Sequence, residues 1–214
     1  MADLEDRSLP PPRVHHTALV EDGASIGNGT AIWDNVHVRR GARIGRSCIV
    51  GEKTYIAGDA VIGDLCKLNA VVYVCANVTI EDGVMIAAHA VFTNDRAPRA
   101  CDPDLLALLP SDPGQKTQTT IVRRGATIGA NATIGPGLEL GAFCMVGMGS
   151  VVTRDVEAHG LVVGNPARLV GAVCRCGERV ATFAGGASPE RATFRCAHCA
   201  RSFEWQAGDP HPRC

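Results

Sequence analysis

The feature that most constrains this sequence is an apolar residue at every sixth position from 14 to 92. The positions in question are Val14, Val20, Ile26, Ile32, Val38, Ile44, Val50, Ile56, Ile62, Leu68, Val74, Ile80, Ile86 and Phe92. Neither an α-helix, with 3.6 residues per turn, nor an amphipathic strand, with period two, produces this spacing. The pattern stops at Phe92 and resumes in the same form at Val122, Ile128, Ile134, Leu140, Val146 and Val152.

A six-residue period predicts a β-helix, in which each hexad is a short strand plus a turn and three hexads make one triangular coil. The aliphatic residue fills the interior and the small residue two positions earlier lies near a corner. Glycines that follow the aliphatic residue, such as Gly27 and Gly51, are interpreted as permitting the turns. Coils then stack about 4.8 Å apart through backbone hydrogen bonds. We predict an all-β fold with a parallel β-helix of about seven coils, because ordinary strands in a sandwich would not keep this phase.

The composition excludes several classes of function. The chain has 214 residues, with 21 Lys and Arg against 22 Asp and Glu. This balance of charge predicts neither a basic surface for nucleic acids nor binding to a membrane surface. No apolar stretch reaches transmembrane length and the N-terminus lacks the form of a signal peptide, so we expect a cytoplasmic protein.

The repeat also predicts the domain organisation. Residues 1–13 are charged and Pro-rich and are expected to be a loose N-terminal tail. Residues 14–170 form the β-helix domain, and 93–118 interrupt the repeat as an inserted loop of the kind that often carries function. In that loop Asp102 as N-cap and Pro110 as a stop predict a short helix with an apolar face.

Residues 171–214 are predicted to be a separate zinc-ribbon-like module. Cys174 and Cys176 are followed after nineteen residues by Cys196 and Cys199. Tetrahedral Zn²⁺ takes four thiolates, and two turns that each carry a cysteine pair would supply a closed, structural site. His198 is an alternative ligand. The few aromatic residues of this module would form a small core, and so small a core usually needs a metal: Phe183, Phe194, Phe203 and Trp205.

Two segments resemble a known family. The runs Gly147-Met-Gly-Ser-Val-Val-Thr-Arg-Asp-Val156 and Val163-Gly-Asn-Pro-Ala-Arg168 resemble the closing segment of the left-handed β-helix (hexapeptide-repeat) acyltransferases. The run Phe92-Thr-Asn-Asp-Arg-Ala-Pro-Arg-Ala100 is similar to enzymes that acetylate the amine of nucleotide-linked amino-deoxysugars. The resemblance implies a left-handed β-helix, a homotrimer with its active site between subunits, and acetyl-CoA bound along the last coils. Some of these enzymes carry a similar Cys-rich tail.

The resemblance also implies roles for individual residues. Asn94 is expected at the substrate amine or an adjacent hydroxyl, and Asp95 at sugar hydroxyls or in the order of the loop. Arg96 and Arg99 are expected at the diphosphate, or else are solvated loop charges. The residues expected to bind acetyl-CoA lie in the closing segment: Gly147, Gly149, Asn165, Pro166 and Arg168.

Two positions bear on which residue could act as the general base: position 97 and His89. Related O-acetyltransferases carry a His-Pro whose histidine is the general base, and this chain has Ala97-Pro98 instead. A neutral amine needs such a base much less than a hydroxyl does, so the difference favours N-acylation. His89, five residues before Asn94, is predicted either to accept the proton of the attacking amine or to be an inert surface histidine.

The sequence therefore predicts an acetyl-CoA-dependent N-acetyltransferase that acts on a nucleotide-linked amino-deoxysugar. A γ-type carbonic anhydrase, which shares the repeat, is disfavoured: it needs three histidine ligands, whereas the coils offer His37 and His89 and residues 119–152 contain none. The remaining alternative is a non-enzymatic β-helix scaffold or assembly subunit that docks through the zinc module.

Overall fold

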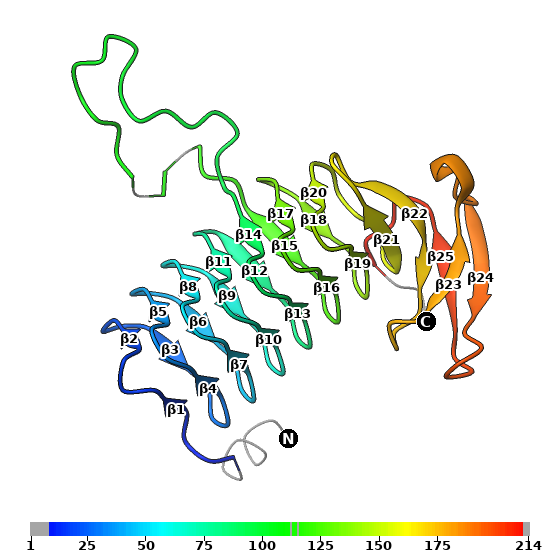
Figure 1. Cartoon of the computed structure of the whole chain (residues 1–214), viewed down its shortest axis with the longest axis horizontal. Helices are drawn as coiled ribbons and strands as arrows, with labels where there is room; N and C mark the ends of the chain where they lie inside the picture. Colours follow the sequence, from blue (N-terminus) through cyan, green and yellow to red (C-terminus); the bar gives the residue numbers. More distant parts are fainter. Residues whose placement is uncertain (1–8, 112, 115, 212–214) are drawn as a thin grey trace.

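A computed structural model describes residues 9–111, 113–114 and 116–211 of the chain. Residues 1–8, most of the predicted N-terminal tail, lie outside the described residues. The described part is a stack of short strands that winds into a triangular parallel β-helix, with the strand Arg13–Val14 at one end and a small β module at the other (Figure 1). The predicted fold class is confirmed.

Each coil contributes one strand to each of three parallel sheets. Sheet A contains β1 (Arg13–Val14), β4 (Ala31–Ile32), β7 (Ile49–Val50), β10 (Lys67–Leu68), β13 (Met85–Ile86), β16 (Thr127–Ile128) and β19 (Met145–Val146). Sheet B contains β2 (Leu19–Val20), β5 (His37–Val38), β8 (Tyr55–Ile56), β11 (Tyr73–Val74), β14 (Val91–Phe92), β17 (Thr133–Ile134) and β20 (Val151–Val152). Sheet C contains β3 (Ser25–Ile26), β6 (Arg43–Ile44), β9 (Val61–Ile62), β12 (Val78–Ile80), β15 (Thr120–Val122) and β18 (Glu139–Leu140).

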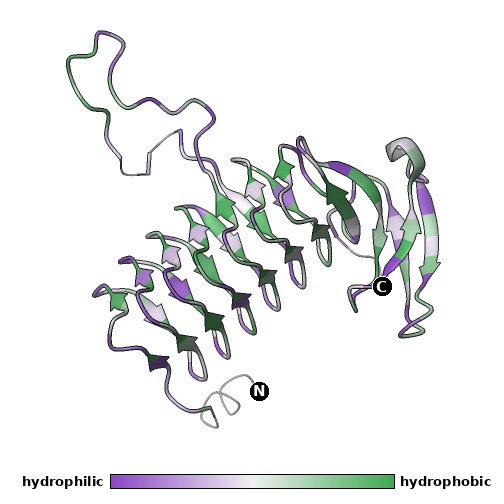
Figure 2. Ribbon diagram, viewed as in Figure 1, coloured by the Kyte–Doolittle hydropathy of each residue, from purple (hydrophilic) through white to green (hydrophobic). Residues whose placement is uncertain are grey.

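The register shows why the period of six persists. Arg13 pairs with Ala31 and Tyr55 with Tyr73, so neighbours in a sheet are three hexads apart in sequence. Equivalent residues therefore stack, and the aliphatic position of nearly every hexad is buried in one continuous core. Apolar residues recur along the strands of successive coils (Figure 2). Cys48, Cys66 and Cys144 are buried at the small inward positions, where they pack as small apolar side chains.

The glycines that follow the aliphatic residue have a different role from the predicted one. Gly27 and Gly51 do not have positive φ; instead, a Cβ on Gly27 would lie 2.6 Å from the backbone carbon of Gly45, and one on Gly51 would lie 2.7 Å from the nitrogen of Ala70. The left-handed conformation occurs two residues later, for example at Gly29 with φ +75°. The first set of glycines therefore allows coils to approach closely, and the second set makes the turns.

The inserted loop runs from the end of β14 to the start of β15 and projects away from the coils (Figure 1). Its predicted helix at 102–110 is wrong. Cys101 instead forms an antiparallel bridge with Leu108, and the Asp102 carboxylate accepts a hydrogen bond from the backbone N–H of Leu106 at 2.8 Å. Leu105 adopts φ 58°, which ends any helical path.

The module continues sheet A beyond the last coil. β21 (Gly160–Val163) pairs in parallel with β19, and β22 (Arg168–Val173) and β23 (Arg179–Thr182) follow in antiparallel order, so residue 170 lies inside a strand. After η2 (Ala184–Gly186), a hairpin of β24 (Arg191–Arg195) and β25 (Ser202–Gln206) completes the module. Its core contains Phe183, Phe203 and Trp205, with Phe194 partly buried against them.

Candidate active site

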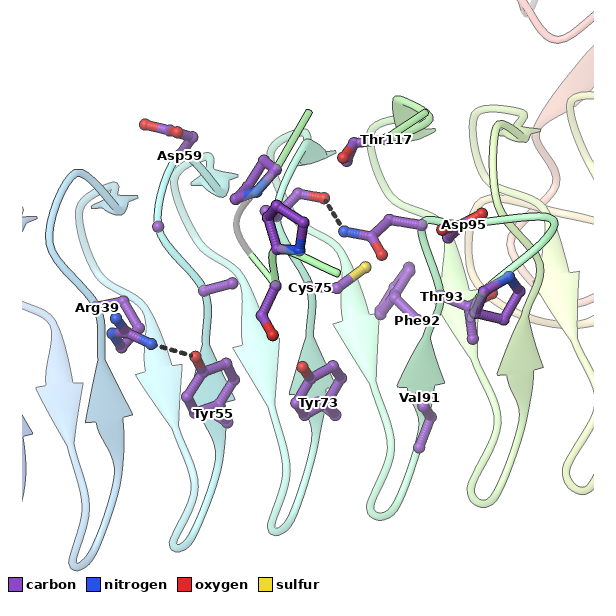
Figure 3. Close-up of a pocket in the computed structure, with 18 of the residues that line it drawn as sticks. Arg39, Tyr55, Asp59, Tyr73, Cys75, Val91, Phe92, Thr93, Asp95 and Thr117 are labelled. Carbon is purple, nitrogen blue, oxygen red and sulfur yellow. Dashed lines mark hydrogen bonds between the residues drawn. The ribbon is translucent and has the colours of Figure 1, made fainter. Parts of the chain in front are cut away.

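A cavity of about 640 Å³ lies over the outward face of sheet B, where the inserted loop leaves the coils. Its wall on the coil side comes from β8, β11 and β14 and includes Tyr55, Tyr73 and Val91 (Figure 3). The loop contributes both of its stems, with Asn94, Asp95 and Pro98 on one side and Pro110 and Thr117 on the other. The cavity therefore exists because the repeat is interrupted at this coil.

The first residues of the loop are fixed by hydrogen bonds to neighbouring coils. The Asn94 side-chain amide donates to the carbonyl oxygen of Ala76 at 3.3 Å, and the Asn94 carbonyl accepts from the N–H of Gln118 at 2.8 Å. The Asp95 carboxylate accepts from the N–H of Ala97 at 2.7 Å. Asn94 and Asp95 thus line the cavity, and Asp95 orders the turn that starts the loop.

The two loop arginines do not line this cavity. Arg96 donates to the carbonyl oxygen of Pro136 at 3.4 Å, towards the next coil, and Arg99 donates to the carbonyl oxygen of Pro98 at 2.8 Å. Arg39 and Arg40 line it instead. They lie in the turn after β5, and the stacking of coils brings that turn to the cavity, which the loop sequence alone does not reveal.

The carboxylate of Glu21 fixes the side of the cavity that Arg39 and Arg40 line. Glu21 accepts from the Arg39 Nε at 2.7 Å, and Arg39 also donates to the Tyr55 hydroxyl at 2.9 Å (Figure 3). The backbone N–H of Arg40 and the side chain of His37 hydrogen-bond to Glu21 and lower the pKa of its carboxyl group. Within the described residues the Arg40 guanidinium has no ion pair, so it is the cation available to an anionic ligand.

Tyr55 and Tyr73 are site residues that the sequence reasoning missed. Their rings stack with centroids 5.1 Å apart and planes 7° apart. Burial raises the pKa of the Tyr73 hydroxyl and raises that of the neighbouring Cys75 thiol to about 11, so both stay protonated at neutral pH. The available signal was that both tyrosines precede an inward residue and are one coil, or eighteen residues, apart.

His89 lies at another corner of the coil from Asn94. It occupies the exposed turn between β13 and β14, with φ 62° and its backbone N–H bonded to the Ala70 carbonyl oxygen at 3.1 Å. Sheet B separates this turn from the corner after β14, where Asn94 lies. Within one chain the predicted base therefore does not reach the cavity, because the five residues from His89 to Asn94 cross one whole face of the triangular coil.

The closing segment, residues 147–168, connects the last coil to the module. Gly164–Ala167 turns β21 into β22 and contains Asn165 and Pro166. A second cavity of about 600 Å³ opens beside it, lined by Arg154 and Arg168 and, from the module, by Phe183 and Ser188. Gly147, Gly149, Asn165 and Pro166 do not line this cavity, whereas Arg168 does and Arg154 is a further cation that the sequence reasoning missed.

The four predicted zinc ligands converge. Cys174 and Cys176 lie in the turn between β22 and β23, and Cys196 and Cys199 lie in the turn between β24 and β25. Their Sγ atoms all lie within 4.8 Å of one another, with Cys174 to Cys199 at 3.5 Å and Cys176 to Cys196 at 3.6 Å. Because Zn–S bonds of about 2.3 Å imply S–S edges near 3.8 Å in a tetrahedron, the arrangement fits a zinc ion. His198 is not part of the group.

Comparison with known proteins agrees with this architecture. The bacterial transferase hexapeptide (six repeats) family matches residues 23–58 and 59–94. Residues 23–94, about a third of the chain, therefore carry the repeat that this family model describes. Structurally it is similar to a variant of AntD, an N-acyltransferase from Bacillus cereus solved with dTDP and coenzyme A, with TM-score 0.52, 20% identity and coverage of 82% of this chain and 90% of that one. At this identity the likeness establishes the shared fold.

Sequence relatives match over short segments. The dTDP-3-amino-3,6-dideoxy-α-D-galactopyranose 3-N-acetyltransferase of Aneurinibacillus thermoaerophilus is 56% identical over 57 residues, which are 27% of this chain and 30% of that enzyme. Serine acetyltransferase 4 of Arabidopsis thaliana is 49% identical over 49 residues, 23% of this chain and 14% of that enzyme. The matches thus span less than a third of these curated relatives. In the described part of the chain, no helix is long and apolar enough to span a membrane.

Proposed function

We propose that this protein is an N-acetyltransferase that moves an acetyl group from acetyl-CoA to the amine of a nucleotide-linked amino-deoxysugar. The observation that carries the proposal is the 56% identity, over 57 residues, to an enzyme whose name states this chemistry. The cavity at Asn94 supports it, because the interrupted coil exposes a polar group there beside a wall of aromatic and cationic residues.

Asn94 is the residue we assign to the substrate amine. Its amide nitrogen is already bonded to the Ala76 carbonyl oxygen, which leaves its side-chain oxygen to accept a hydrogen bond from the amine. That contact would fix the nitrogen for attack on the thioester carbon. The C–S bond then breaks, the CoA thiolate leaves, and the amine loses one proton.

The proton does not need a base from the same chain. The lone pair of a neutral amine already attacks a thioester, and the departing thiolate or water can take the proton after the C–N bond forms. Asp95 is engaged with the loop backbone, and His89 lies at another corner. His89 would reach the amine only from an adjacent protomer, which the proposed homotrimer with active sites between subunits would allow.

The acetyl-CoA site is proposed at the closing segment. Arg168 and Arg154 line the cavity beside the last coil and are suited to the phosphates of CoA. Gly147, Gly149, Asn165 and Pro166 shape the backbone around that segment. We also propose a cytoplasmic location, because the proposed donor is acetyl-CoA and the cysteines of the described residues are free thiols, which persist in a reducing compartment.

A structural zinc ion is proposed in the module. Cys174, Cys176, Cys196 and Cys199 would hold it, and it would join the two turns without taking part in catalysis. Cys196→Ser should lower the measured zinc content from about one per chain and shift Trp205 fluorescence to that of an exposed indole. Cys101→Ser, which removes a thiol outside the cluster, should change neither. One zinc per chain in Cys196→Ser would remove this assignment.

The activity is tested by mass spectrometry with acetyl-CoA and a panel of dTDP- and UDP-linked amino sugars. A gain of one acetyl group on one sugar is the expected result, with turnover reduced roughly 100-fold in Asn94→Ala. His89→Ala should keep most of its turnover. Loss of turnover in His89→Ala with acceptor binding intact would make the histidine of an adjacent protomer the base.

Two further results bear on the alternatives. Multi-angle light scattering should give three times the 22.4 kDa of one chain. If no sugar reacts and calorimetry detects no binding of acetyl-CoA, the enzyme proposal falls and the scaffold function takes its place.

A further inference from the structure

The outward side chains of sheet B form a ladder of rings that ends inside the cavity. His37, Tyr55 and Tyr73 occupy the same strand position in consecutive coils. The His37 ring meets Tyr55 edge-on at 5.3 Å, and Tyr55 stacks on Tyr73 at 5.1 Å. Arg39 holds the ladder in place by donating to the Tyr55 hydroxyl (Figure 3).

The next position along the ladder carries a short side chain, that of Val91. Val91 pairs with Tyr73 in register, is 37% exposed and lines the cavity, and the position after it is Thr133. Tyr73 itself is 44% exposed. One face of the Tyr73 ring is covered by Tyr55, while the side towards β14 meets no other ring among the described residues. The missing ring leaves the depth of one coil, about 4.8 Å, which suits one flat heterocycle.

We infer that the cavity binds the nucleobase of the acceptor over Val91, stacked on the free face of Tyr73. The inference rests on the proposed function and adds the residue that recognises the nucleotide. Stacking on tyrosine is a general mode of base recognition, and it tolerates different bases because each has a π-face.

The acceptor base fits this position better than the adenine of CoA. Asn94 follows Val91 by three residues, at most about 11 Å along an extended chain, so one nucleotide-linked sugar can reach both. The proposed CoA segment begins at Gly147, past β17, which separates it from Val91 by further coils. The acceptor base and the adenine of CoA are both aromatic heterocycles, and binding experiments with separate probes distinguish them.

The test measures binding to the full-length protein by calorimetry, with dTDP, UDP, CoA and pyrophosphate as probes. Tyr73→Leu should weaken dTDP and UDP binding roughly 5- to 100-fold. Tyr73→Phe, which keeps the ring, should bind within about threefold of wild type. Trp33→Leu removes another exposed aromatic residue, on the turn after β4, and should leave all affinities unchanged. Pyrophosphate, which has no base, should bind all variants equally.

Proton NMR of bound dTDP gives a second readout. Base protons stacked on Tyr73 should shift upfield, and the shift should disappear in Tyr73→Leu but persist in Tyr73→Phe. Unchanged dTDP affinity and shifts in a folded Tyr73→Leu protein would overturn the inference. A loss confined to CoA would also overturn it, because the platform would then hold adenine.

The outcomes separate the inference from the proposed function. Tyr73-dependent binding of dTDP without acetyl transfer to any sugar would leave the base platform standing and remove the transferase. Acetyl transfer with the same acceptor KM in wild type and Tyr73→Leu would retain the transferase and remove the platform. Absence of dTDP and UDP binding by the wild type would overturn the platform directly.

Discussion

His159 joins the module to the last coil, and its protonation should loosen that joint. The ring stacks on Phe203 of the module at 3.8 Å and on Phe143 of the coil at 5.4 Å. Its Nδ1 donates to the Val173 carbonyl oxygen at 2.8 Å, whereas the buried Nε2 has no hydrogen-bond partner among the described residues. A second proton would therefore place a charge and an unpaired donor in an apolar stack.

The magnitude follows from the pKa of His159. Burial, followed by the charge of Arg175, lowers this pKa from 6.5 to about 4. Because the folded pKa is below the unfolded one, the contribution to stability is complete above about pH 6.5 and is lost as the pH falls towards 4. Between pH 8 and pH 5 the free energy of unfolding should fall by about 2 kcal/mol from this group alone.

The measurement is urea unfolding at pH 5, 6, 7 and 8, followed by the fluorescence of Trp205 in the module. His159→Phe keeps an aromatic ring in the stack and removes the titrating group, so its stability should lack this 2 kcal/mol of pH dependence. Protonation of other groups, including the cysteines, affects both proteins and cancels in the difference. Equal loss of stability in the two proteins between pH 8 and pH 5 would refute the argument.

The remaining predictions concern the coils. Gly51→Ala should lower the free energy of unfolding by about 2 kcal/mol or more, because its Cβ would meet the backbone of the next coil. Gly83→Asn should cost less than about 1 kcal/mol, because Gly83 has φ +68° and a Cβ there would come no closer than 4.0 Å to the Gly125 nitrogen. Thermal melts compare the two variants. Asp64→Asn should cost under about 1 kcal/mol at pH 7. The Arg46 side chain lowers the pKa of Asp64, so this difference should disappear as acid protonates the wild-type carboxylate, in unfolding measured down to pH 2.

Much of the candidate site could be predicted from the sequence, and the rest depended on the stacking of coils. Asn94 and Asp95 mark the point where the repeat breaks, so their place at a cavity follows from the pattern. Arg39 and Tyr55 carry no such mark, because they enter the site from earlier coils. The reverse holds for His89, which is near Asn94 in sequence but lies at another corner of the triangle.

By itself the sequence determined the parallel β-helix, its buried aliphatic columns and the four clustered cysteines. These depend on a local rule, repeated every six residues, that each hexad obeys independently of the others. Tertiary structure decided what lies beside what: the close approach at Gly27, the ring ladder ending at Tyr73, and the burial of His159 between coil and module. Those contacts join residues that are sixteen or more positions apart, and the register between coils exists only once the chain has wound.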